Sequence, residues 1–150
     1  MLLYKNGRLY AGQSSFALPD GCKINDAPLA SYPNGINLKS EDEQYMIDVN
    51  FEFGQGGAER SLKDGHLQED FPKVEFRSKD CPGGVGWIAE YCGDMFSYFE
   101  ARFDAPTGLT GRDGSEVNLF RIMVTAPRSM SPKAIGRLPV IAGLLNSFLP

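Results

Sequence analysis

The sequence predicts an α+β domain, an antiparallel β-sheet of about six to seven strands sandwiched between helices (α/β/α). Alternating apolar and polar residues predict most of the strands, because successive side chains point to opposite faces of a sheet. Tight-turn residues at 6–7 and 93–94 join runs that follow one another in the chain, which favours antiparallel pairing. Segments with helical character near residues 57–70 and 132–148 supply the helices. The length of 150 residues fits one domain over 1–150.

The N-terminal segment predicts a hairpin followed by a short strand. Asn6-Gly7 separates two alternating runs, and both residues tolerate the positive φ of a type I′ turn. The run from Ser15 ends at a Leu-Pro-Asp-Gly turn over residues 18–21, where Pro fixes φ and Gly relieves strain. Residues 24–34 hold two prolines and little periodicity, so they are predicted to be loop.

The run at 45–53 predicts the best-defined strand. Its odd-numbered residues are Tyr, Ile, Val, Phe and Phe, whereas its even-numbered residues are mostly polar. Together with 36–39 and an acidic turn it predicts a second hairpin. A glycine-rich stretch then ends the strand, and the following helix is weakened by Gly65 and ended by Pro72.

The second half of the chain predicts a meander of strands at 73–79, 85–92, 95–103 and 118–126. The middle two runs carry apolar residues on both parities, as is typical of central strands covered on both faces. Residues 104–115, with one proline and three glycines, are predicted to form a surface loop.

The C-terminal segment predicts a helix that packs through one apolar stripe. Ser131-Pro132 is a cap followed by proline at the first helical position. Pro139 cannot donate an amide hydrogen bond, so it must kink this helix or mark a restart within it. The stripe consists of Ala134, Leu138, Ile141, Leu145 and Phe148.

Charge and hydropathy argue against two classes of partner. The net charge is −4 and the basic residues are dispersed, whereas nucleic-acid affinity rests on clustered Lys and Arg, so no nucleic acid is expected. No run reaches the roughly 18 apolar residues of a membrane span. The first residues lack a basic leader followed by an apolar core, so no secretory signal is expected and a cytoplasmic location is favoured.

The three cysteines, Cys22, Cys81 and Cys92, do not describe a disulfide framework, because their number is odd and their spacing unrelated. A bridge between Cys81 and Cys92 across neighbouring strands stays open. The favoured interpretation is three free, partly buried thiols in a reducing compartment.

The order of these elements resembles the PsbP-like superfamily, which includes an extrinsic photosystem subunit, a nuclear-import factor that binds the small GTPase Ran, and many small bacterial proteins. The resemblance spans nearly the whole chain and rests on Phe16 to Gly21, the strand from Tyr45 to Phe53, and the closing Leu144 to Phe148. It implies an antiparallel sheet between helices and a non-enzymatic accessory role. It carries over no catalytic or binding residue.

No catalytic or metal site and no cofactor are predicted from the residue patterns. The glycine-rich stretch at 54–57 lacks a nucleotide-binding spacing and is interpreted as a strand-to-helix connection. The single histidine, His66, argues against zinc, whose sites draw four ligands mainly from Cys and His.

Aromatic residues of the central meander are the candidate binding residues, with Trp87 and Tyr98 foremost, because such residues are enriched where proteins bind partners. They would line a groove if one sheet face is incompletely covered. The alternative is that they fill the core against the C-terminal helix.

The leading functional hypothesis is a non-catalytic binding or accessory protein whose partner is another protein. One alternative is a small enzyme whose cleft gathers dispersed residues such as His66, Cys81 and Asp94. The other is a structural subunit of a homo-oligomer, which would bury a large apolar patch across a two-fold axis.

Overall fold

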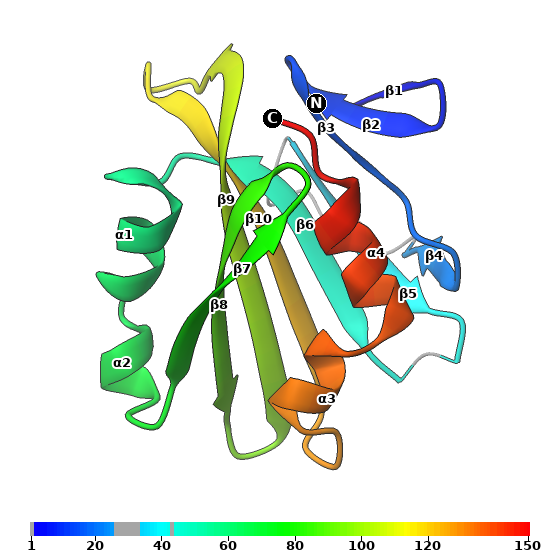
Figure 1. Cartoon of the computed structure of the whole chain (residues 1–150), viewed down its shortest axis with the longest axis vertical. Helices are drawn as coiled ribbons and strands as arrows, with labels where there is room; N and C mark the ends of the chain where they lie inside the picture. Colours follow the sequence, from blue (N-terminus) through cyan, green and yellow to red (C-terminus); the bar gives the residue numbers. More distant parts are fainter. Residues whose placement is uncertain (1, 26–33, 43) are drawn as a thin grey trace.

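The computed structural model describes residues 2–25, 34–42 and 44–150. A seven-stranded antiparallel sheet forms the centre of the fold (Figure 1). The predicted loop over 24–34 lies mostly outside the described residues. Each strand pairs with its neighbours in antiparallel register. The strand order is β4 (Cys22–Ile24), β5 (Gly35–Ser40), β6 (Met46–Glu52), β10 (Glu116–Pro127), β9 (Phe96–Thr110), β8 (Gly84–Cys92) and β7 (Glu75–Cys81).

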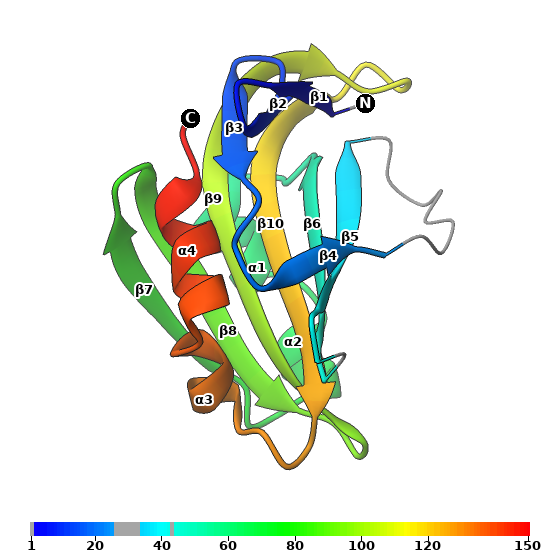
Figure 2. The same cartoon turned by 90° about the vertical axis from the view of Figure 1, so that its right-hand side faces the viewer.

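A separate three-stranded sheet is built from β1 (Leu3–Lys5), β2 (Arg8–Ala11) and β3 (Ser14–Ala17). The predicted Asn6-Gly7 hairpin is confirmed, with both turn residues at positive φ. The small sheet lies over one end of β9 and β10 (Figure 2), where the amide of Gln13 donates to the carbonyl of Thr107 at 3.0 Å. Strand β4, which follows the Leu-Pro-Asp-Gly turn directly, was not predicted from the sequence.

The predicted hairpin of residues 36–39 and 45–53 is confirmed as β5 and β6. Ile47, Val49 and Phe51 are fully buried on one face of β6, as the alternation predicts. Phe53 departs from the pattern because it follows the end of the strand, and its side chain is exposed.

Both predicted helices are broken into two. The segment 57–70 forms α1 (Gly57–Lys63) and α2 (Leu67–Asp70), interrupted around Gly65. The C-terminal segment forms α3 (Pro132–Gly136) and α4 (Pro139–Ser147), so Pro139 marks a restart. The Ser131 cap is confirmed, since its hydroxyl accepts from the amide of Ala134 at 3.1 Å.

The predicted surface loop over 104–115 is wrong for most of its length, because β9 continues through residue 110 and only the following residues turn. Ala105 and Thr107 are buried on this extension, and the Thr107 hydroxyl donates to the carbonyl of Val117. The pairing register with β10 shifts across residue 118, and this irregularity accommodates the proline and glycine of the extension within a strand.

Apolar residues cover both faces of β8 and β9, as predicted for central strands. On β9, Phe99 belongs to the main core, which also holds Ile135 of α3 and four buried residues of α4. Tyr98, which points to the opposite face, belongs to a second cluster with Leu62 of α1. The α+β class and the antiparallel sheet are therefore confirmed, as a mostly-β fold with short helices.

No helix among the described residues is long and apolar enough to cross a membrane.

Candidate functional site

A groove of about 550 Å³ opens at the end of the main sheet, between the connection from α2 to β7 and the connection from β10 to α3. The last residues of β8 form its floor. We call it the β8 groove. Its lining residues are Asp70, Phe71, Pro72, Lys73, Val74, Glu75, Glu90, Tyr91, Cys92, Arg128, Ser131, Pro132 and Lys133.

The first wall of the groove is fixed by the end of α2. Phe71 closes the helix, with its amide donating to the carbonyl of Leu67 at 2.7 Å, and Pro72 prevents the helix from continuing. The ring of Phe71 packs against Tyr91 on the floor, with centroids 4.6 Å apart. Phe71 therefore anchors this wall to the sheet, and the wall's apolar surface lies among the charged residues Asp70, Lys73 and Glu75.

The second wall is the connection into α3, held in place by polar contacts. Arg128 donates through Nη1 to the carbonyl of Gly93 at 2.7 Å, which ties the wall to the β8–β9 turn. Lys133, the second residue of α3, lies with Nζ 3.7 Å from Glu75 Oε2. That exposed ion pair joins the two walls.

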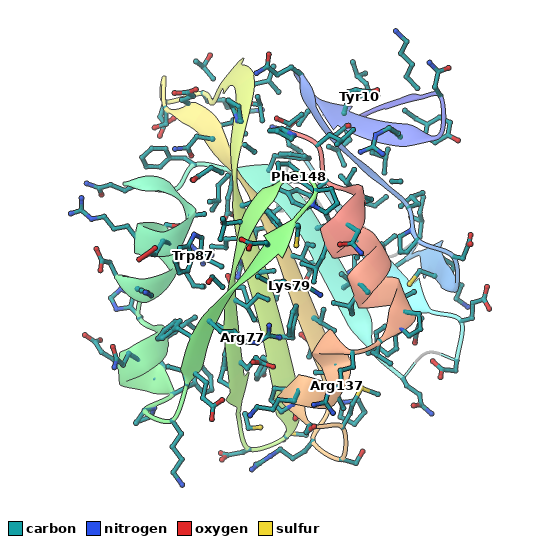
Figure 3. The ribbon with its side chains drawn as sticks, viewed as in Figure 1. Tyr10, Arg77, Lys79, Trp87, Arg137 and Phe148 are labelled. Atoms are coloured by element: carbon teal, nitrogen blue, oxygen red, sulfur yellow. The ribbon has the colours of Figure 1, made fainter. Side chains whose placement is uncertain are left out.

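Glu90 on the floor is the unusual residue of the groove. It is only 4% exposed, and its Oε1 accepts from Arg77 Nε at 2.8 Å. Its Oε2 is buried and has no hydrogen-bond partner among the residues that the structure describes. Figure 3 shows Arg77 over the β7–β8 hairpin, on the side that faces α3. A buried carboxylate oxygen without a donor is costly, so the floor offers an unused acceptor.

Sequence reasoning missed Glu90. The signal was present, because this residue is the one charge within the otherwise apolar run from Val85 to Cys92.

The structure places Trp87 and Tyr98 on the sheet face that contacts α1, not against the C-terminal helix. Trp87 lies beside α1 (Figure 3), with Lys63 Nζ 5.0 Å from its ring centroid. The ring of Tyr98 stacks on the ring of Tyr91, with centroids 5.0 Å apart. Tyr98 therefore contacts a lining residue of the β8 groove but does not line the groove itself. Both side chains are partly buried in the second cluster.

The β8–β9 turn beside the groove exposes two large apolar residues. The exposed fraction is 74% for Met95 and 41% for Phe96. Arg128 of the groove contacts this turn at Gly93, so the exposed pair lies in the connection next to the groove.

None of the three residues named for an enzyme lines the β8 groove or the second pocket described below. His66 is exposed at the start of α2, beside Glu69. Cys81 ends β7, and burial raises the pKa of its thiol, which disfavours the reactive thiolate. Asp94 lies in the β8–β9 turn.

The three cysteines are free thiols. Cys81 and Cys92 lie at opposite ends of the β7–β8 hairpin, since Cys81 pairs with Gly84 at the turn. The bridge that the sequence left open is therefore absent.

On the sheet face that contacts α1, opposite the face of Glu90, Glu100 forms a buried ion cluster with two arginines. Its Oε1 lies 2.7 Å from Arg121 Nε and accepts from Arg102 Nε at 2.8 Å. Burial alone would raise the pKa of Glu100, but the two guanidinium groups outweigh it and hold the pKa below its ordinary value. Burial and the Glu100 charge raise the pKa of the neighbouring Tyr91 hydroxyl. The Glu100 carboxylate is thus already supplied with donors.

The glycine-rich connection before α1 is engaged within the fold. Asn118 Oδ1 accepts from the amide of Gly54 at 2.8 Å, and Asp104 Oδ1 accepts from the amide of Ala58 at 2.7 Å. These two amides are not free to bind phosphate. Across the described part of the chain, no group of three or more His, Cys, Asp or Glu side chains is arranged to hold a metal ion.

A second pocket of about 600 Å³ lies between the Leu-Pro-Asp-Gly turn and α4. Its one ionisable carboxylate, Asp20, is exposed. It has no buried charged group comparable to Glu90. The lining residues are Ala17, Leu18, Pro19, Asp20, Gly21, Tyr45, Pro139, Val140, Gly143 and Ser147.

No family model matches the chain, and no curated protein matches it significantly.

Proposed function

We propose that the protein is a non-catalytic binding protein that engages another protein through the β8 groove and the adjacent turn. The observation that carries this proposal is the pair Met95 and Phe96, exposed next to an apolar groove. Exposed apolar side chains beside a concave surface are typical of protein-binding sites. The scattered positions of His66, Cys81 and Asp94 count against the enzyme alternative.

The test compares two pairs of exposed apolar residues. Proteins retained by the wild-type chain from its native host are identified by mass spectrometry, and the purified partner is then titrated against variants. We expect Met95→Ser with Phe96→Ser to weaken binding about tenfold or more, as loss of interface anchors does. Leu3→Ser with Tyr4→Ser is the matched control, because these residues are 65% and 70% exposed on β1.

Equal affinity of the two double variants would refute the proposal. Sedimentation of the pure protein tests the homo-oligomer alternative separately: a stable dimer that only the Met95 and Phe96 substitutions dissociate would identify the turn as a self-association surface.

We also propose kinship with the PsbP-like superfamily and its α/β/α sandwich. Support comes from Leu62 of α1 and Ile135 of α3, which pack in clusters on opposite faces of the sheet. Further support comes from Phe148, which follows the closing helix and is completely buried. An experimental structure superposed on a PsbP-like domain tests the proposal, and a different strand order would reject it.

A further inference from the structure

We propose that the β8 groove receives the ammonium group of a lysine side chain from the protein partner, with Glu90 as its acceptor. The inference rests on the proposed function and deepens it by naming the group that is recognised. It begins from Glu90 Oε2, which has no hydrogen-bond partner in the described ranges and belongs to a groove-lining residue whose side chain is 3% exposed.

The chemistry of Glu90 selects a donor rather than an acceptor. An ionised carboxylate only accepts hydrogen bonds, and its bonds to charged donors are roughly twice as strong as neutral ones. Arg77 contacts only Oε1 of the two Glu90 oxygens, and its own side chain is 44% exposed. Solvent therefore weakens the attraction between the Arg77 guanidinium and the buried carboxylate. A cationic donor at Oε2 would satisfy the remaining acceptor.

The shape and lining of the groove select a cation on an aliphatic stem. Phe71, Pro72, Val74 and Pro132 supply apolar surface for methylene groups, as lysine side chains require. Glu90 lines the same groove as this apolar surface.

The cations of the rim do not already occupy this role. Lys133 is paired with Glu75, and Arg128 donates to the carbonyl of Gly93. Lys73, the third cation of the lining, makes no hydrogen bond to Glu90 Oε2 among the residues that the structure describes.

The test uses two blocked amino acids, N-acetyl-lysine N-methylamide and its norleucine counterpart, titrated into ¹⁵N-labelled protein and followed by NMR. The norleucine compound keeps the stem and lacks the ammonium group. We expect the lysine compound to shift the amide signals of residues 90–92 and 71–75 and to bind about tenfold more tightly than the norleucine compound. Equal affinities would overturn the inference.

Three variants test whether Glu90 binds the ammonium group or only stabilises the fold. Glu90→Gln is expected to weaken binding of the lysine compound about tenfold or more, whereas Glu69→Gln, at an exposed carboxylate outside the groove, changes it less than about twofold. Arg77→Gln removes the same ion pair but keeps the Glu90 carboxylate, so binding is expected to be retained or strengthened. Equal loss in the Glu90 and Arg77 variants would assign Glu90 a purely structural role and overturn the inference.

The two proposals fail in different ways. If the lysine compound binds through Glu90 while the Met95 and Phe96 substitutions leave partner affinity unchanged, the proposed protein interface fails. If those substitutions abolish partner binding while the compound does not bind, the lysine inference fails alone.

Discussion

Replacing Phe148 by Ala is expected to lower the free energy of unfolding by about 3–5 kcal/mol. The Phe148 ring is completely buried although it lies near the C-terminus. It stacks on Phe120 at 4.7 Å with an interplanar angle of 7° and contacts Phe103 at 5.0 Å. Such aromatic pairs add about 0.5–1.5 kcal/mol each beyond the burial of area, so we expect a loss in the upper part of the range.

Urea denaturation followed by circular dichroism measures this loss, with an unchanged slope showing that the same surface unfolds. Leu149→Ala is the matched control, because Leu149 is 47% exposed and its backbone bonds to Ser15 survive the substitution. The control is expected to lose less than about 0.5 kcal/mol. A loss below about 1 kcal/mol for Phe148→Ala would refute the argument that this ring closes the core.

Three further predictions concern other parts of the fold. Glu100→Gln should cost about 3–5 kcal/mol at pH 7 by removing the buried carboxylate that Arg102 and Arg121 share. Because the folded pKa of Glu100 is lowered, this contribution exists above about pH 4.5 and fades as pH falls through the folded pKa, so the difference from wild type in urea titrations should be smaller at pH 3 than at pH 7. Ser131→Ala should cost about 1 kcal/mol in the same assay, through loss of the α3 cap, and an unchanged midpoint would contradict the capping role. Gly12→Ala should lower the melting temperature far more than Gly7→Ala, because a Cβ at Gly12 would lie 2.0 Å from the carbonyl oxygen of Thr107. Gly7 faces open space, so its substitution bears only the positive-φ cost of about 1–2 kcal/mol. Similar melting temperatures for the two variants would disprove the close approach.

Local signals predicted the elements whose conformation is decided within a few residues. The Asn6-Gly7 turn follows from two residues that tolerate positive φ, and the Ser131 cap follows from one hydroxyl placed before a proline. The alternation over 46–52 sets which face of β6 is buried.

Elements decided by distant partners were missed. The extension of β9 through residues 104–110 carries proline and glycine, and it is a strand because β10 pairs with it and Gln13 docks on it. Strand β4 has only three residues and exists through its pairing with β5. Tertiary hydrogen bonds override local turn propensity in both places.

The candidate groove could not be predicted because its walls come from segments about 60 residues apart in sequence, 70–75 and 128–133, that meet only over the end of β8. The sequence favours Trp87 and Tyr98 because aromatic residues are enriched where proteins bind partners. The structure buries much of both in the second cluster, whereas Met95 and Phe96 are each more exposed than either of them.

Two buried glutamates show why a charge in an apolar strand has no single meaning. Glu90 and Glu100 occupy neighbouring strands and are 4% and 1% exposed, so burial does not distinguish them. Glu100 faces two arginines and the hydroxyl of Tyr91, and both of its oxygens are within reach of a donor. Glu90, next to a groove, has a single arginine on one oxygen, and its other oxygen has no donor within the described part of the chain. A buried carboxylate whose partners are all supplied by its own fold stabilises that fold, whereas one with an unmet acceptor at a concave surface gains free energy from a donor that arrives from outside. That asymmetry is the reason to look for a ligand at Glu90 and not at Glu100.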